Sequence, residues 1–511
     1  MLPIAIAVLS FAVYTLAVLT LHQGRHTPFA LEEEGPFPAA LSRRLYPLAT
    51  HGRMELGVHD FLAKRVGAGV PAEQALDEAA AAGAAPVGAV ILTRDGTGIG
   101  GIVMAEAAFA LFGLGTQALP LFFLVLVGLS AAVFIWRYRD QRMSAVPTVL
   151  FALTLLLLTP LSTAIDYVAQ APVGGLRYYS VVGVLPALHW CLEFFEQGRA
   201  PGRVPRWAAL GLQVAILGFA MLVRGSPAYL IGPVVVCAAA ALWRGTARRW
   251  RIALVLLLPA VLLRVETTTL PRWAFPEYAA AGRLYGTVWH RMFVSFGENP
   301  AWPFAGVPET YRCPAEIPEG IIPGLVDRNA QCVWWGYIRR QGIPNHEGID
   351  GMYGARYEKV LRSAFFAIVK TYPREAFLTF FYYKPAALFG VLVQSTLQWW
   401  NAARLTVWLC LIQVLLLCVF VIARPPARPL RDLGRRAGLL ALFAGFGVLP
   451  QLIAWPNPFT TADMIAYRLA VYAIAVTCAV AAARWLLARS FRLAPADGES
   501  VPVPAVAGRD G

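Results

Sequence analysis

The chain has 511 residues, of which 58% are hydrophobic and 14% are charged, and its formal net charge is +14. A soluble globular protein has about 25% charged residues, so this composition excludes an ordinary soluble domain and indicates a polytopic membrane protein. The basic excess does not indicate a nucleic-acid partner, because the arginines gather at the ends of apolar runs. Membrane topology and anionic lipid headgroups account for arginines in such places.

In chain order, the apolar runs predict about ten membrane crossings, with both chain ends in the cytoplasm. The first run has neither a basic start nor a clear cleavage site, so we interpret it as an uncleaved helix. The predicted crossings are Met1–Leu21, Ala118–Trp136, Ala145–Thr163, Leu176–Phe195, Trp207–Val223, Ala228–Trp243, Ile252–Val265, Leu405–Ala423, Gly438–Ala454 and Leu469–Leu487.

The orientation follows from the arginine-dense loops, because positive charge near membrane ends marks the cytoplasmic face. These loops are Arg137–Arg142, Arg199–Arg206, Arg244–Arg251 and Arg424–Arg436. The two long loops, roughly Leu21–Thr97 and Glu266–Ala376, are therefore predicted to lie outside.

Two shorter apolar stretches, Gly98–Gly113 and Phe377–Val393, are predicted as helices in the outer interface. Counting either one as a crossing would place an arginine-dense loop outside. The second long loop is rich in Pro, Trp and Tyr, which predicts an ordered segment, and a helix is expected at Tyr353–Thr371.

The chain is thus divided into a first crossing, a first outer loop with interfacial helices, the second to seventh crossings, a large second outer loop with an interfacial helix, the last three crossings and a disordered cytoplasmic tail. The corresponding residues are 1–21, 22–116, 117–265, 266–400, 401–490 and 491–511.

Two of the seven cysteines, Cys313 and Cys332, lie in the second outer loop, and the others lie inside apolar runs. Buried cysteines in apolar runs are most often inert. In an oxidising compartment, Cys313 and Cys332 are predicted to form a disulfide.

Three segments follow one another in the first half of the chain: Asp95–Gly101, the Ala105–Gly115 stretch that contains Leu111-Phe112-Gly113, and Ala118-Leu119-Pro120, which opens a crossing that ends in basic residues. Later, Val223–Pro227 forms a turn at the outer end of a crossing. This order resembles the dolichyl-phosphate-mannose-type (GT-C) glycosyltransferases. The resemblance covers Met1–Val265 by motif and the rest of the chain by layout alone. The Arg-Pro-Asp that the family usually has after the third crossing is absent.

The resemblance implies an all-α, GT-C-like bundle that carries out inverting sugar transfer on the outer face of a bacterial inner membrane. The donor would be a polyprenyl-phosphate sugar, and the acceptor a glycolipid, a polysaccharide or a protein. No cofactor is predicted, and no ligand motif supports a divalent metal. Two alternatives are a transporter or flippase for a lipid-linked saccharide, and a non-catalytic partner in envelope polysaccharide assembly.

The family's catalytic base is an acidic residue early in the first outer loop, ahead of a Leu-Ala pair. Counting back from Leu62-Ala63 gives Glu55 as the first choice and Asp60, on the same predicted helix, as the second. The non-catalytic alternative is that both carboxylates lie on the solvated face of an interfacial helix.

Most of the further candidates lie at predicted outer helix ends, where cations stabilise a leaving phosphate. His290 instead follows the seventh crossing among aromatic residues, where it could hydrogen-bond a phosphate or a sugar hydroxyl, and the alternative for it is a structural histidine. These residues also have non-functional alternatives. An acidic residue at a membrane end can simply be solvated, and an arginine there can be a snorkelling anchor. Arg264 and Glu266 could instead pair with each other. The candidate substrate-binding residues are Asp166, Arg177, Arg224, Arg264, Glu266 and His290.

Overall fold

In the computed structural model most of the described residues are helical, the rest lie in turns and loops, and none of the described residues forms a strand. The longer described stretches are residues 118–138, 180–195, 205–223, 229–244, 288–311, 328–344 and 354–390. Isolated residues between 12 and 112, between 261 and 269 and between 438 and 486 complete the description.

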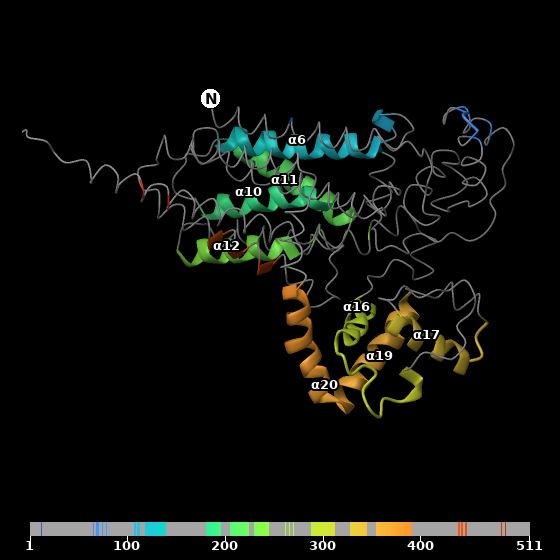
Figure 1. Ribbon diagram of the computed structural model, residues 1–511. Helices are drawn as coiled ribbons and strands as arrows, with labels where there is room; N and C mark the ends of the chain where they lie inside the picture. The colour runs from blue at the N-terminus through green and yellow to red at the C-terminus, as the bar shows by residue number, and fades with distance from the viewer. Residues whose placement is uncertain are drawn as a thin grey trace, which may run out of the picture.

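The first group of helices forms a bundle in which the long elements lie side by side (Figure 1). Its members are apolar along almost their whole length, and α11 begins with a proline, which suits the first turn of a helix. Within the described residues, no helix combines the length and the hydropathy that a membrane crossing requires. The elements are α6 (Ala118–Tyr138), the 3-10 turn η1 (Ser180–Gly183), α10 (Val184–Phe195), α11 (Pro205–Val223) and α12 (Ile231–Trp243).

Side-chain contacts fix the relative directions of three bundle helices. Phe122 of α6 packs edge-on against Phe219 of α11, whereas Ser130, further along α6, bonds Gln213, which comes earlier in α11. These two helices are therefore antiparallel. Phe134 of α6 contacts His189 of α10. Further along both helices, Arg137 of α6 pairs with Glu193 of α10, so α6 and α10 are parallel.

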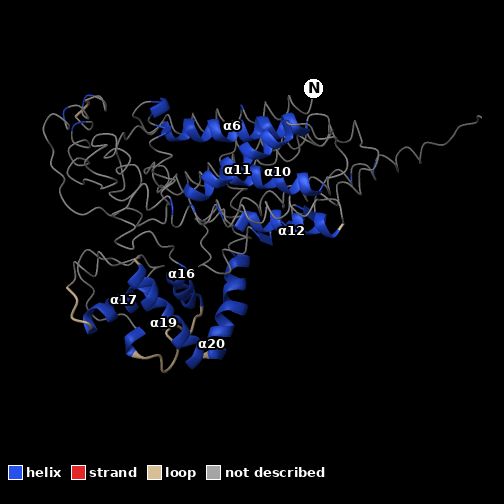
Figure 2. Cartoon of the chain, turned by 180° about the vertical axis from the view of Figure 1, so that it is seen from behind, coloured by secondary structure: helices blue, strands red, loops and turns tan. Residues whose placement is uncertain are grey.

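The second group of helices forms a smaller lobe, which lies beneath the bundle in Figures 1 and 2. In Figure 1 the lobe is placed toward the end of the bundle from which α6 starts. The elements are α16 (Val288–Val294), η4 (Ser295–Glu298), η5 (Glu309–Tyr311), α17 (Arg328–Arg340), α19 (Ala355–Thr371), α20 (Pro373–Leu378) and the π-helical turn η6 (Thr379–Tyr383), after which residues 384–390 are helical.

The lobe has an aromatic core of its own. Phe296 is fully buried and stacks on Trp302 at 5.5 Å between ring centroids, and Phe304 and Phe365 lie against it at 6.1 and 5.4 Å. Each such ring contributes about 1.5–3 kcal/mol by burial, with a further gain from edge-to-face geometry. The described residues of the predicted second outer loop thus pack into a folded body, and the helix expected at Tyr353–Thr371 is found at Ala355–Thr371.

Cys332 lies buried in α17 and is disulfide-bonded. Cys191 and Cys237 of the bundle are free thiols, as the sequence indicated for cysteines in apolar runs. Cys313 lies outside the described residues, so its pairing with Cys332 stays a prediction.

Candidate functional site

His290 is the candidate substrate-binding residue that the structure describes in detail, and it lies in the lobe at the start of α16. Its side chain is only 7% exposed, and its Nδ1 shares a hydrogen bond of 2.6 Å with the hydroxyl of Tyr357 on α19. The two rings also contact each other. His290 thus faces the core of the lobe, where its contacts with Tyr357 join α16 to α19.

Glu358, next to Tyr357, caps the beginning of α16. Its carboxylate accepts the backbone N–H of Trp289 at 2.8 Å and that of His290 at 3.2 Å. These are donors that a helix leaves unpaired in its first turn, and the helix dipole favours negative charge there. Burial raises the pKa of Glu358, and the two backbone hydrogen bonds act in the opposite direction. The lobe therefore holds a carboxylate whose proton affinity depends on its contact with α16.

Lys384 is the second unusual ionisable group of the lobe. It is fully buried, its Nζ donates to Ser295 Oγ at 2.8 Å, and it lies 4.8 Å from the centroid of the Phe380 ring. Burial lowers the pKa of Lys384 to about 7, and the nearby carboxylate of Glu298 acts to raise it. Burial raises the pKa of Glu298 in turn, with Lys384 opposing that rise. A lysine of this kind titrates near neutral pH.

The same region is held together by polar contacts between η4 and the α20–η6 helix. Asn299 Nδ2 donates to Thr379 Oγ1 at 3.1 Å, and the Thr379 hydroxyl donates to the Glu375 carbonyl at 2.8 Å. The Ser295 hydroxyl in turn donates a hydrogen bond to the Arg291 carbonyl at 2.8 Å. Together with the Lys384–Ser295 hydrogen bond, these contacts hold the helix formed by α20, η6 and residues 384–390 against the rest of the lobe.

The outer side of α16 and α19 presents an aromatic and cationic surface. Trp289 is half-buried, the guanidinium carbon of Arg362 lies 5.5 Å from its ring centroid, and Phe366 packs beside it at 5.2 Å. Aromatic faces pack against the apolar faces of sugar rings, and an exposed guanidinium binds anionic groups in a bidentate manner. The surface therefore presents aromatic rings and a guanidinium side by side.

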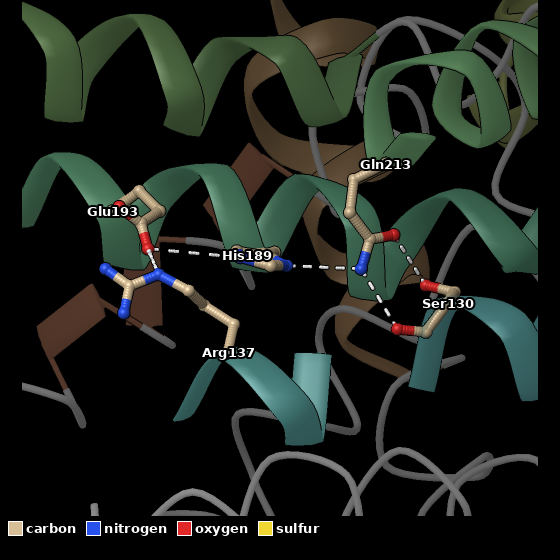
Figure 3. Close-up of polar contacts among 5 residues, drawn as sticks. All are labelled: Ser130, Arg137, His189, Glu193 and Gln213. Atoms are coloured by element: carbon tan, nitrogen blue, oxygen red, sulfur yellow. Dashed lines mark hydrogen bonds and ion pairs between the residues drawn. The ribbon is translucent and has the colours of Figure 1, made fainter. Parts of the chain in front are cut away.

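A separate network of polar side chains lies inside the bundle (Figure 3). Ser130 donates to Gln213 Oε1 at 2.8 Å, and Gln213 Nε2 donates to the Ser130 carbonyl at 3.0 Å and contacts His189 Nδ1 at 3.2 Å. Four residues on from His189, Glu193 forms an ion pair with Arg137 at 2.6 Å and lies 4.0 Å from His189 Nε2. The chain of contacts joins α6, α10 and α11.

The hydrogen bonds determine how this chain is polarised. The Ser130 carbonyl only accepts, so the amide nitrogen of Gln213 must face it, and the same NH₂ group then donates to His189 Nδ1. With Nδ1 accepting, the proton of a neutral imidazole lies on Nε2, on the side of Glu193. All of these side chains except Arg137 are nearly or completely inaccessible.

The other candidate residues predicted from the sequence are not among those that the structure describes. Outside the described residues lie both candidates for the base, Glu55 and Asp60, and most of the candidates for phosphate and sugar binding. These further residues are Asp166, Arg177, Arg224, Arg264 and Glu266. Their roles, and the contacts between them, remain predictions.

Lys384, Glu358 and the bundle group were missed by sequence reasoning, although two of them carry a recognisable signal. Lys384 stands in the apolar stretch Phe377–Val393, and His189 and Glu193 stand inside a predicted crossing. An ionisable residue within an apolar run indicates a specific partner, since its burial alone is costly. Glu358, on an amphipathic helix, carries no such signal.

Among the side chains that the structure describes, no three His, Cys, Asp or Glu residues are grouped in a way that would hold a metal ion. Comparison with protein-family models, with curated proteins and with solved structures gives no match for this chain.

Proposed function

We propose that the protein is an integral membrane glycosyltransferase of the GT-C type, which transfers a sugar from a polyprenyl-phosphate donor on the outer face of the membrane. The observation that carries the proposal is the lobe built from the predicted second outer loop. It is an ordered helical body with an aromatic core, and it lies toward the end of the bundle where α6 begins. In the predicted topology that end of α6 is the outer one.

The directions of the bundle helices support the same topology. α6 and α10 correspond to the second and fourth predicted crossings and run parallel, and α11 corresponds to the fifth and runs against α6. Crossings separated by one other crossing must share a direction. The Arg137–Glu193 ion pair then lies at the predicted cytoplasmic ends of α6 and α10.

The proposed chemistry uses the sequence-predicted residues. The acceptor hydroxyl oxygen attacks the anomeric carbon, the bond from that carbon to the phosphate oxygen breaks, and a carboxylate, Glu55 or Asp60, takes the hydroxyl proton. Arg177 and Arg224 stabilise the charge that develops on the departing lipid phosphate. The acceptor contacts the aromatic and cationic face formed by Trp289 and Arg362.

The test is sugar transfer by the purified full-length protein, with a panel of polyprenyl-phosphate sugars as donors. Glu55→Gln and Asp60→Asn are compared with wild type and with Glu309→Gln, which alters an exposed carboxylate of the lobe. Loss of the base lowers the rate by about 10²–10⁴-fold in one of the first two variants, and the control keeps the wild-type rate. If no donor is turned over and lipid-linked oligosaccharide still binds, the protein is not a transferase.

The buried polar chain of the bundle favours one alternative, a transporter of lipid-linked saccharides. Ionisable groups within membrane segments are typical of proton-coupled transport, and His189 and Glu193 lie inside a predicted crossing. A liposome assay separates the two functions. A transporter moves a fluorescent lipid-linked sugar across the bilayer and loses this activity in His189→Gln, whereas a transferase moves the sugar to an acceptor without needing a second leaflet.

A further inference from the structure

The α20–η6 helix carries a stripe of exposed aromatic side chains. Phe377, Phe381 and Phe389 are 60%, 70% and 68% exposed, and Tyr382 is 62% exposed beside them. Phe377 and Phe381 stack at 4.7 Å between centroids, which is the spacing of neighbours on one helical face. Large aromatic side chains gathered on a single face of a helix indicate a surface that another apolar phase covers.

The opposite face of the same helix is committed to the lobe. Ala376, Thr379, Lys384 and Leu388 are all buried. Their contacts include the Asn299–Thr379 and Lys384–Ser295 hydrogen bonds. The aromatic stripe therefore cannot turn inward without breaking buried polar contacts, each of which is costly to lose. The fold holds the stripe outward.

The placement and the charges of the helix identify what covers the stripe. In Figures 1 and 2 the helix that begins with α20 runs across, not along, the direction of the bundle helices. Arg374 is exposed in the first turn of this helix, three residues before Phe377, and Lys370 is exposed in the last turn of α19, which directly precedes it. A helix with aromatic and basic side chains that lies across membrane-spanning segments has the character of an interfacial helix, whose rings enter the headgroup boundary and whose cations meet lipid phosphates.

We infer that the stripe of Phe377, Phe381, Tyr382 and Phe389 is a lipid-binding surface that seats the lobe on the outer leaflet of the membrane, with Lys370 and Arg374 against anionic headgroups. This inference rests on the proposed membrane location but not on the proposed sugar transfer. Seating the lobe in this way fixes its distance from the bilayer, in which the tail of a lipid-linked donor remains.

The test measures the depth of spin labels in the full-length protein reconstituted in nanodiscs that contain anionic lipid. A nitroxide is attached at Phe381→Cys, and in a second variant at Phe389→Cys. The matched control is Ser363→Cys, an exposed polar position on α19. Labelled wild type supplies the background from the native cysteines, of which Cys191 and Cys237 are buried and Cys332 is in a disulfide.

On the stripe, collisions with oxygen relative to a water-soluble nickel chelate are expected to be several-fold more frequent than at Ser363→Cys, because oxygen concentrates in lipid. A ratio equal to that of Ser363→Cys at both stripe positions means water contact and overturns the inference. Low access to both reagents means a protein partner and also overturns it. Sugar transfer by the same samples is scored separately, so a failed transferase assay leaves the depth result intact, and the reverse.

Discussion

The ammonium of Lys384 is an ordinary cation in the unfolded chain and a buried one in the lobe. Its pKa is about 7 when folded, against 10.5 for the free side chain. Between these values the unfolded state binds more protons than the folded state, so stability rises as the pH increases from about 7 toward 10.5. The sign is the reverse of that for a lysine held by an ion pair, because burial is the dominant cause here.

We expect Lys384→Met to abolish this dependence. Methionine fills similar space without a charge, so the variant gains stability over wild type below about pH 7, on the order of a few kcal/mol less the lost bond to Ser295. Thermal unfolding of the purified proteins between pH 6.5 and 9 measures it: the wild-type midpoint rises and that of the variant changes less. Lys370→Met, at an exposed site, should follow wild type. A wild type whose slope matches that of Lys384→Met would show an ordinary lysine.

At the scale of single elements, α12 packs so closely on a neighbour that a side chain added at one glycine would have to displace that neighbour. A Cβ at Gly232 would overlap the ring of Phe446, which belongs to the predicted crossing Gly438–Ala454. By contrast, a Cβ at Gly211 in α11 meets nothing within 4 Å. Small residues that let helices approach closely are typical of membrane bundles.

Gly232→Leu should therefore force α12 away from Phe446 and destabilise the bundle by about 1–3 kcal/mol, the usual effect of overpacking. Gly211→Ala is the matched control and should be neutral or slightly stabilising, since alanine is the better helix former. The two variants are compared by thermal unfolding and by the fraction that elutes as the intact protein in detergent. Equal behaviour of both variants would show that α12 is not packed at Phe446.

The polar chain of the bundle specifies how α6, α10 and α11 pack. Gln213 makes two hydrogen bonds with Ser130 and also contacts His189. Gln213→Leu removes these bonds, and each buried polar group that is left unsatisfied should lower the free energy of unfolding by about 1–3 kcal/mol. Ser130→Ala removes only the hydroxyl. In a double-mutant cycle the two substitutions should be clearly non-additive, because they remove the same hydrogen bond. Additive losses of stability would mean that the two residues act independently.

At the scale of the whole molecule, and within the residues that the structure describes, the apolar runs of the sequence located the helices well and their packing partners poorly. The apolar runs Ala118–Trp136 and Trp207–Val223 appear as α6 (Ala118–Tyr138) and α11 (Pro205–Val223), because a continuous apolar segment bounded by Arg or Pro has few alternatives to a helix. The single interfacial helix expected at Phe377–Val393 is in fact part of a longer element that begins at Pro373 and includes a π-helical turn. No local pattern signals that turn.

The contacts that define the candidate site were harder to foresee. His290, a candidate for substrate binding, shares a hydrogen bond with Tyr357, which lies 67 residues further along the chain, and its contact with a substrate stays a prediction. The separation between Ser295 and Lys384 is 89 residues. Such pairs depend on how α16, α19 and the α20–η6 helix pack, and hydrophobic periodicity determines which face of a helix is buried without determining what it is buried against.

The arrangement of the whole chain makes one further prediction, that the lobe and the arginine-dense loops lie on opposite sides of the membrane. The test places one cysteine in each: Ser363→Cys on α19 and Gly202→Cys in the loop Arg199–Arg206. In sealed right-side-out vesicles, an impermeant maleimide should label Ser363→Cys at once and Gly202→Cys only after detergent is added, because positive charge near membrane ends is retained in the cytoplasm.

Two other results are informative about the same topology. Reversed labelling would place the lobe in the cytoplasm and would remove the outer-face chemistry, since a lobe on that side cannot meet an acceptor outside. Labelling of both cysteines in sealed vesicles would mean that no membrane separates the two segments. Wild-type protein corrects for the native cysteines, and Cys332 stays unreactive as long as its disulfide is intact. The prediction thus joins the charge pattern of the sequence to the side on which the folded lobe works.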